Sequence, residues 1–260
     1  MKRRKFLTAG AAATGLLTTA QLGQAATPAP KKRDYYELRT YLLENNRQED
    51  IVESYLQNAF IPALNRQGIK PVGVFKEMEP GEQKKLWVLI TYPSIDKFTN
   101  LISSLQEDKD YLKKGAEYLD TPKSAPGYER IISSFMAAFD EITRIEAPGS
   151  GERMFELRRY ESHNEAFGNR KVHMFNEAGE IAIFRETGLQ PVFFGKALIG
   201  EQLPNLTYMV WFKDMAAHDE AWAKFREHPE WVRIKDLPEY KDTVSNITKT
   251  YLKPTSYSQV

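Results

Sequence analysis

Tyr36-Glu37-Leu38-Arg39 and Phe155-Glu156-Leu157-Arg158 decide the fold, because nearly the same tetrapeptide stands twice in the chain, 119 positions apart (155 − 36). The landmarks after each copy recur in the same order: a helix-like stretch, a Gly-x-x-Pro-Val segment, an aromatic-rich strand pattern and a second helix-like stretch. The chain is therefore expected to be a tandem repeat, with one copy over residues 34–146 and the other over 152–258.

Residues 1–26 have the pattern of a twin-arginine export signal. The segment Lys2-Arg3-Arg4-Lys5-Phe6-Leu7 precedes a weakly apolar run over 9–20, which is too short to span a membrane. Small residues near position 25 offer a cleavage site, and 27–33 is expected to be a linker. We therefore expect an exported, periplasmic protein without an integral membrane segment in the mature chain. The alternative is a basic tail on a cytoplasmic protein.

Composition excludes several classes of function. The chain contains no cysteine, which excludes disulfides and thiolate chemistry and fits a protein that folds in a reducing cytoplasm before export. Without the four basic residues of the signal, 36 − 4 = 32 basic side chains stand against 35 acidic ones. A nucleic-acid partner is not expected, because no basic stripe is present.

Hydrophobic periodicity predicts the same series of elements in both copies. In the first copy the predicted elements are a strand over 35–42, a helix over 51–64, strands over 72–78 and 86–92, a helix that begins after Ser94, a charged helical insertion over 107–119 and a strand over 129–139. In the second they are a strand over 154–160, a helix over 170–186, strands over 191–198 and 206–212, a helix over 216–227 and a strand over 245–252.

This order, β-α-β-β-α-β, predicts an α+β fold made of two ferredoxin-like repeats. In each repeat two helices cover one face of a four-stranded antiparallel sheet and leave the other face bare. Two such units in one chain can bury their bare faces against each other. We therefore expect the two sheets to pair as an α/β barrel of the kind that other proteins form by dimerisation.

The residues that carry the repeat also carry a resemblance. The segments Tyr36-Glu37-Leu38-Arg39-Thr40-Tyr41, Phe155-Glu156-Leu157-Arg158-Arg159-Tyr160, 206–212 and His228-Pro229-Glu230-Trp231 resemble the NIPSNAP family of the dimeric α/β-barrel superfamily. The resemblance implies the ferredoxin-like fold but brings no catalytic residues. The first copy departs from the pattern, because it lacks a His-Pro-Glu-Trp segment near its end and carries the charged insertion.

The polar side chains of the first strand in each copy are the first candidate site. If Leu38 and Leu157 face the helices, the alternate residues of these strands point between the two sheets, where charges must be paired. This interpretation predicts an internal pocket that binds an anionic or carbonyl-bearing ligand through Arg39, Tyr41, Glu156, Arg158 and Tyr160. In the simpler alternative each Glu and Arg pair with one another and fix the strand register.

The second copy holds all four histidines and three of the four tryptophans, so a localised function is expected there. This asymmetry adds four candidate ligand-binding residues: His163, His173, Trp211 and His228. No two histidines stand three or four positions apart, so no metal site is expected. Trp222, Phe225 and Trp231 are more typical of packing between helix and sheet.

The sequence leaves three functions open, because it contains no nucleophile motif and no phosphate-binding glycine loop. The favoured one is an exported NIPSNAP-like protein that binds a small molecule in a pocket of the α/β barrel. The second is an oxygenase-like enzyme, either cofactor-free or dependent on haem, with a pocket between sheet and helices. The third is a structural module that assembles through sheet edges and bare faces, and a homodimer is a further expectation. No cofactor is required by the sequence.

Overall fold

The computed structural model describes residues 32–149 and 151–260. The predicted export signal over 1–26 and most of the predicted linker over 27–33 lie outside the described residues. Within the described residues no helix is both long enough and apolar enough to cross a membrane.

The first copy contains the elements expected from its periodicity. In chain order they are β1 (Tyr35–Leu43), α1 (Asn46–Tyr55), the π-helical turn η1 (Leu56–Phe60), α2 (Ile61–Arg66), β2 (Val72–Glu77), β3 (Lys84–Tyr92), α3 (Ile95–Thr99), α4 (Leu101–Glu107), α5 (Lys109–Lys114), α6 (Ala116–Leu119) and β4 (Arg130–Ala138). Ser94 caps α3 as predicted, because its hydroxyl accepts a hydrogen bond from the Lys97 amide. The first helix starts before residue 51 because Asn45 caps it.

The second copy repeats the order with two differences from the prediction. Its elements are β5 (Met154–Glu161), α7 (Glu165–Asn176), α8 (Glu180–Thr187), β6 (Gln190–Ile199), β7 (Asn205–Phe212), α9 (Met215–Glu227), α10 (Pro229–Lys235), the 3-10 turn η2 (Pro238–Tyr240) and β8 (Asn246–Pro254). The single helix expected over 170–186 is divided into α7 and α8, because Gly179 takes a left-handed conformation with φ of 88°. The short helix α10, which begins at Pro229, was not predicted.

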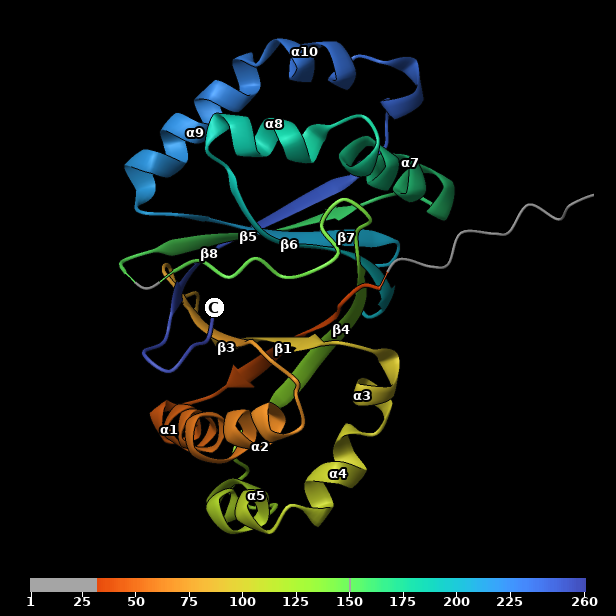
Figure 1. The fold of residues 1–260 in the computed structure, drawn as a ribbon. Helices are drawn as coiled ribbons and strands as arrows, with labels where there is room; N and C mark the ends of the chain where they lie inside the picture. Colours follow the sequence, from red (N-terminus) through yellow and green to blue (C-terminus); the bar gives the residue numbers. More distant parts are fainter. Residues whose placement is uncertain (1–31, 150) are drawn as a thin grey trace, which may run out of the picture. The chain divides into compact units, whose positions relative to one another are not determined.

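The eight strands of the described chain form one closed antiparallel barrel in the order β1-β3-β2-β8-β5-β7-β6-β4 (Figure 1). Each copy contributes four neighbouring strands, and the copies join where β2 pairs with β8 and β4 pairs with β6. The prediction of two ferredoxin-like repeats with paired sheets is confirmed. Closure leaves no free sheet edge and no bare sheet face among these strands, which are the two features that favoured a structural assembly module.

The assignment of strand faces was wrong. The barrel interior is apolar and contains Leu38 and Leu157, together with Tyr36, Phe155 and Met209. The alternate residues therefore point outward, beneath the helices. The expected ladder of Glu, Arg and Tyr between the two sheets does not form. Instead, each copy forms its own Glu–Arg cluster between its sheet and its helices. Figure 1 shows the helices of the two copies on opposite sides of the barrel.

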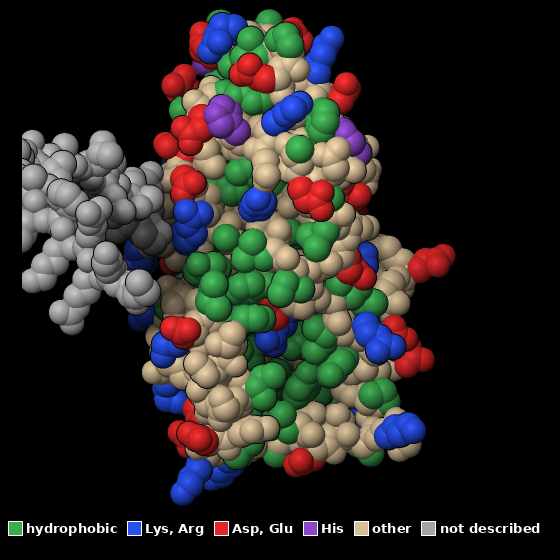
Figure 2. Space-filling view, turned by 90° about the vertical axis from the view of Figure 1, so that its right-hand side faces the viewer, with side chains coloured by type: hydrophobic (Ala, Val, Ile, Leu, Met, Phe, Trp, Pro, Cys, Tyr) green, Lys and Arg blue, Asp and Glu red, His purple; other side chains and the backbone are tan. Residues whose placement is uncertain are grey.

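Exposed hydrophobic side chains gather on the side of the barrel that Figure 2 shows. Large exposed hydrophobic residues of the described chain include Ile95 and Ile102 on α3 and α4, and Leu198, Ile199 and Leu203 at the β6–β7 hairpin. Ile102 and Ile199 are the most exposed of these, at 72% and 65%.

Candidate functional site

In the first copy the polar cluster is closed. Arg39 donates to both carboxylate oxygens of Glu37, at 2.5 and 3.1 Å. The hydroxyls of Tyr92 and Ser133 also donate to this carboxylate, each at 2.8 Å. Burial raises the pKa of Glu37, but the charge of Arg39 and these hydrogen bonds outweigh it and lower the pKa below its ordinary value. The mutual satisfaction of Glu and Arg that the sequence offered as an alternative is therefore present here.

Aromatic side chains fill the space between sheet and helices in the first copy. Tyr55 stacks on Tyr118 with ring centroids 3.9 Å apart, and its hydroxyl lies 3.0 Å from that of Tyr111. Tyr111 and Tyr118 come from α5 and the α6 turn, which belong to the charged insertion. Tyr41, a predicted ligand-binding residue, is buried in the same cluster. The insertion thus packs this copy rather than opening a site.

In the second copy the equivalent carboxylate divides its bonds among different partners. Glu156 is fully buried, and Arg158 Nε donates to its Oε1 at 2.8 Å. Its other oxygen accepts a 2.8 Å hydrogen bond from Trp222 Nε1, and His218 Nε2 lies 3.4 Å from that oxygen. The Arg158 guanidinium lies over the Trp222 ring, 3.6 Å from its centroid. Arg158 is thus bound to Glu156 through Nε alone, and its Nη1 donates a longer hydrogen bond of 3.4 Å to the Tyr160 hydroxyl.

A pocket of about 390 Å³ opens beside this cluster, between β5 and β8 on one side and α7 to α10 on the other. We call it the Arg158 pocket. Its volume lies in the range typical of small-molecule sites. It is lined by Arg158, Tyr160, Lys171, Glu180, Trp222, Phe225, Arg226, Trp231, Val244, Ile247 and Lys249. Two predicted site residues, Arg158 and Tyr160, therefore lie in one pocket, and Glu156 lies directly behind it.

Side chains in contact form a ring around the Arg158 pocket. Arg158 stacks on Trp222, and the Trp222 ring centroid lies 5.4 Å from that of Phe225. The Phe225 ring centroid in turn lies 4.5 Å from that of Trp231. Lys171 Nζ lies 5.5 Å from the Trp231 ring and 5.7 Å from the Tyr160 ring. Arg158 Nη1 donates to the Tyr160 hydroxyl at 3.4 Å, which closes the ring of contacts. In this ring, aromatic side chains alternate with two cations, Arg158 and Lys171.

The base of the pocket contains a buried ion pair. Lys171 Nζ donates to Glu180 Oε2 at 2.7 Å, and the two side chains are only 5% and 2% exposed. Burial raises the pKa of Glu180, and the neighbouring Lys171 charge opposes this shift only in part. An ammonium carries three N–H groups, so the pair presents both a donor and an acceptor to a ligand.

The sequence did not identify Lys171 and Glu180 as candidates, although a signal was present. Lys171 shares a helix face with the buried residues Met174 and Phe175, at the i, i+3 and i+4 positions. A lysine on the apolar side of a helix must find a buried partner. The neighbouring helix supplies it, because Glu180 is the first residue of α8.

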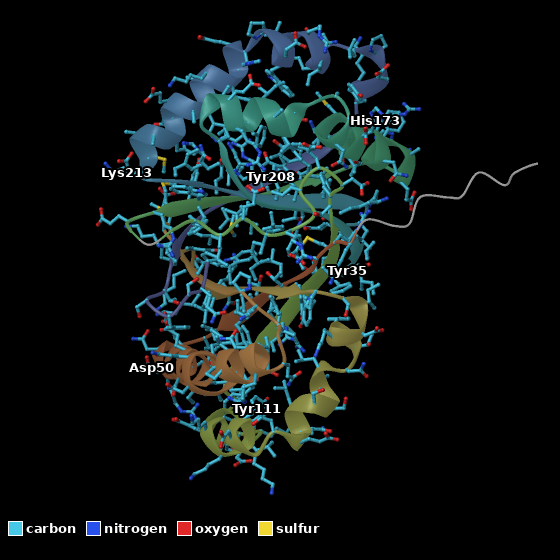
Figure 3. All side chains as sticks on the ribbon, viewed as in Figure 1. Tyr35, Asp50, Tyr111, His173, Tyr208 and Lys213 are labelled. Carbon is cyan, nitrogen blue, oxygen red and sulfur yellow. The ribbon has the colours of Figure 1, made fainter. Side chains whose placement is uncertain are left out.

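The other predicted residues lie elsewhere. Trp211 packs against the barrel interior, since it belongs to the inward-facing set of β7. His163 is exposed and stacks on Phe167, while His228 Nε2 lies 3.1 Å from Glu186. His173 lies on α7, away from the sheet residue Tyr208 (Figure 3), and its Nδ1 is 2.8 Å from the Tyr240 hydroxyl.

These positions do not fit haem, because none of the candidate histidines faces the Arg158 pocket. Among the described residues no group of three or more His, Asp or Glu side chains is arranged to hold a metal ion.

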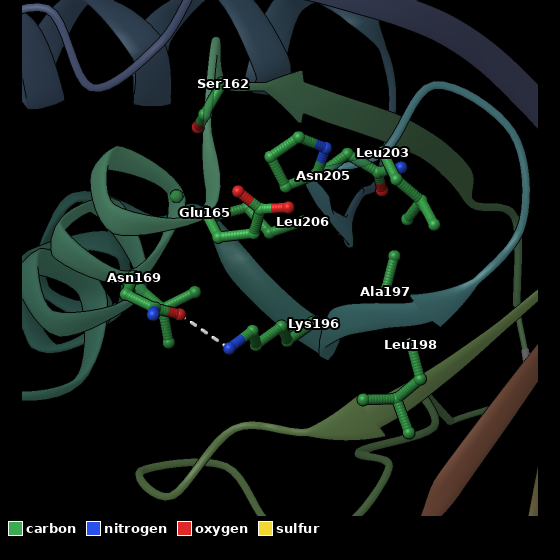
Figure 4. Close-up of a pocket in the computed structure, with 12 residues that line it drawn as sticks. Ser162, Glu165, Asn169, Lys196, Ala197, Leu198, Leu203, Asn205 and Leu206 are labelled. Atoms are coloured by element: carbon green, nitrogen blue, oxygen red, sulfur yellow. Dashed lines mark hydrogen bonds between the residues drawn. The ribbon is translucent and has the colours of Figure 1, made fainter.

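A second, smaller pocket of about 220 Å³ lies at the other end of α7, against the β6–β7 hairpin (Figure 4). Four of its lining residues already form hydrogen bonds within the fold. Lys196 Nζ donates to Asn169 at 2.5 Å, Ser162 donates to the Thr243 carbonyl, and the Asn205 amide donates to backbone carbonyls of the hairpin. This pocket lacks the aromatic walls of the Arg158 pocket. The Arg158 pocket is therefore the stronger candidate site.

Comparison with known proteins agrees with this architecture. The chain is similar in structure to a protein from Lactobacillus acidophilus NCFM whose assignment as a monooxygenase is provisional, with a TM-score of 0.55, 9% identity and coverage of 85% of this chain and 94% of that one. A protein of the same provisional assignment from Fusobacterium nucleatum gives a TM-score of 0.55 and 8% identity, with coverage of 86% and 94%. At such identities the likeness concerns the fold alone.

The match to a family model identifies the family, and a further solved structure is similar to part of the chain. An uncharacterised NIPSNAP-like domain protein from Burkholderia xenovorans is 19% identical, over 43% of this chain and 92% of that one, with a TM-score of 0.38. No curated protein matches the chain in sequence. The NIPSNAP family model matches residues 36–122 and 155–259, one segment in each copy. The chain therefore belongs to the NIPSNAP family.

Proposed function

We propose that this NIPSNAP protein is exported and binds a small molecule in the Arg158 pocket of its second copy. The observation that carries the proposal is the contrast between the copies. The first copy fills the space under its helices with tyrosines, whereas the second keeps a pocket of about 390 Å³ with buried charges and aromatic rings on its walls. Pockets that combine apolar walls with a few polar groups are typical ligand sites.

A thermal-shift screen tests the binding proposal. Ligands that bind the purified protein raise its melting temperature, since a ligand at one hundred times its Kd adds about 2.7 kcal/mol to the free energy of unfolding. The variant Ile247→Trp fills the pocket from its rim, because Ile247 lines the pocket and is 46% exposed. Ile199→Trp is the matched control, since Ile199 is also an exposed strand isoleucine but does not line the pocket.

The expected result is that Ile247→Trp abolishes the ligand-induced shift and Ile199→Trp retains it. If both variants respond to every ligand as the unmodified protein does, the Arg158 pocket is not the binding site. The unliganded melting temperatures of the two variants show whether either substitution disturbs folding.

Export rests on Arg3 and Arg4, which precede an apolar run in the pattern of a twin-arginine signal. The test replaces both arginines with lysine, which preserves the charge of the segment. Fractionation of cells should find the unmodified chain in the periplasm and the doubly substituted chain in the cytoplasm. Equal periplasmic amounts of both would contradict export by this route.

A cofactor-free oxygenase is the alternative that one observation favours. Arg158 and Tyr160 both line the pocket, and the Tyr160 hydroxyl is held 2.9 Å from that of the buried Tyr208. The guanidinium and the Tyr160 hydroxyl are therefore placed to stabilise negative charge that develops on a bound aromatic substrate. Dioxygen consumption by the purified protein with each ligand from the screen distinguishes the two functions. If the protein consumes dioxygen and Ile247→Trp abolishes this consumption, the protein is an enzyme that uses the Arg158 pocket. Ligand binding without dioxygen consumption would support a binding protein.

A further inference from the structure

We infer that the ligand of the Arg158 pocket is a flat aromatic acid, with its carboxylate at Arg158 and Lys249 and a polar group at the Lys171–Glu180 pair. This inference rests on the proposed function and adds to it the chemical class of the ligand. It is carried by three features of the pocket: an excess of positive charge on one wall, aromatic side walls and a buried donor–acceptor pair at the base.

The excess of positive charge arises where β5 meets β8. Arg158 and Lys249 are directly opposite each other across the two strands, and both line the pocket. Like charges in such cross-strand positions repel each other. Arg226 of α9 adds a third cation to the lining. Among the described residues, neither Lys249 nor Arg226 has a carboxylate as an ion-pair partner.

The first copy shows that this repulsion is not required by the fold. In β1 and β4 the position opposite Arg39 is Ser133, and that serine donates to Glu37. The equivalent strand pair thus closes a neutral cluster in one copy and leaves a cationic wall in the other. An anionic ligand would compensate this wall, and a carboxylate fits the planar guanidinium of Arg158.

The side walls favour a flat ring. Trp222, Phe225 and Trp231 line one side of the pocket and Tyr160 another. Trp222, Phe225 and Tyr160 are less than 9% exposed, so these rings are held in place by packing. A planar ligand gains dispersion contacts with such rings that a puckered ring of the same size does not. A volume of about 390 Å³ accommodates two fused rings.

Calorimetry with three matched probes tests the ligand class. The acid 6-hydroxy-2-naphthoate carries a carboxylate at one end of two aromatic rings and a hydroxyl at the other. Its amide, 6-hydroxy-2-naphthamide, removes the charge and preserves the shape, and 6-hydroxydecahydro-2-naphthoate retains the charge and the hydroxyl without the aromatic rings. The naphthoate should bind at least about tenfold more tightly than either of the others, which corresponds to about 1.4 kcal/mol.

Two charge reversals locate the carboxylate. Lys249→Glu should weaken naphthoate binding by about tenfold or more and leave amide binding nearly unchanged. Lys113→Glu is the matched control, since Lys113 is an exposed lysine on α5 in the first copy and changes the net charge by the same amount. This control should change the Kd less than about twofold, because the charge is distant and screened.

The inference is wrong if the naphthoate does not bind, if the amide binds as tightly as the acid, or if Lys249→Glu and Lys113→Glu have equal effects. These results are distinct from failure of the proposed function. The thermal-shift screen could instead find a neutral or aliphatic ligand whose binding Ile247→Trp abolishes. That result would support the Arg158 pocket as the binding site and contradict only the assignment of an aromatic acid as its ligand.

Discussion

Arg158 on β5 and Lys249 on β8 lie directly opposite each other across neighbouring strands, and Arg158 forms its salt bridge with the buried Glu156. The equivalent strands of the first copy place Arg39 opposite Ser133. The duplicated fold therefore tolerates a neutral residue at this position, and we expect the repulsion between Arg158 and Lys249 to lower the stability of the unliganded protein. Residues that lower stability in this way are often retained for binding.

Replacement of Lys249 by Ser should therefore stabilise the unliganded protein. We expect the free energy of unfolding to rise by about 0.5 kcal/mol, because one like-charge contact across the strands is removed. Urea denaturation at low and high salt provides the measurement and its control. The gain should shrink in high salt, since salt screens repulsion between partly exposed charges. Lys249→Arg, which preserves the charge, should show no gain.

Trp222→Phe should destabilise the protein more than Trp231→Phe. Trp222 Nε1 donates to the buried carboxylate of Glu156, and its ring stacks under Arg158. Loss of the indole N–H leaves one oxygen of a fully buried carboxylate without its donor, at a cost of about 1–3 kcal/mol beyond the lost packing. Trp231 is only partly buried and loses a similar ring volume. Equal losses in chemical denaturation would show that the Glu156 hydrogen bond contributes nothing.

Loss of one partner of the Lys171–Glu180 pair should be more costly than loss of both. Lys171→Met leaves a buried carboxylate without its partner and is expected to lower the free energy of unfolding by about 3–5 kcal/mol. The double variant Lys171→Met, Glu180→Leu replaces the pair with apolar side chains and should recover most of this loss. A double-mutant cycle in urea measures the coupling. Additive losses would mean that the two charges do not stabilise each other in the fold.

The sequence was sufficient to predict the strands and their order, but not which strand face lies inside the barrel. Alternation along β1 shows that Leu38 shares a face with Tyr36, and it does not show whether that face meets the helices or the other sheet. Both faces are covered in this fold, so the usual contrast between a wet and a dry face is missing. The polar face lies under the helices because Trp222 and Tyr92 provide hydrogen bonds there.

One signal in the sequence could have resolved the two faces. Gly73 lies in β2 opposite Leu89, which in turn lies opposite Leu38 in β1, so the three residues share a face. A side chain at Gly73 would meet the Phe75 ring at 2.6 Å. A glycine within a strand marks a close approach of other atoms, which occurs in a packed barrel interior. The pocket itself was beyond prediction, because it depends on the separate helices α7 and α8.

Glu37 and Glu180 should affect stability in opposite directions as pH changes. Both carboxyls have an ordinary pKa of 4.5, which folding lowers for Glu37 and raises for Glu180. Below pH 4.5 the unfolded chain takes up a proton at Glu37 before the folded protein does, so the stability that Glu37 provides is lost as pH falls. Above pH 4.5 the folded protein retains a proton at Glu180 that the unfolded chain has released, so stability decreases as pH rises.

Urea denaturation between about pH 3 and 7 measures both effects against the variants Glu37→Gln and Glu180→Gln. The stability of the unmodified protein relative to Glu37→Gln should increase as pH rises through the acid range and then level off. Relative to Glu180→Gln it should decrease as pH rises above 4.5, the ordinary value of this carboxyl. Each variant serves as the control for the other, because both replace one buried carboxyl by an amide. If the two stability differences changed with pH in the same direction, the opposite pKa shifts of Glu37 and Glu180 would be contradicted. A stability difference depends on pH only where the pKa of the replaced carboxyl differs between the folded and unfolded states.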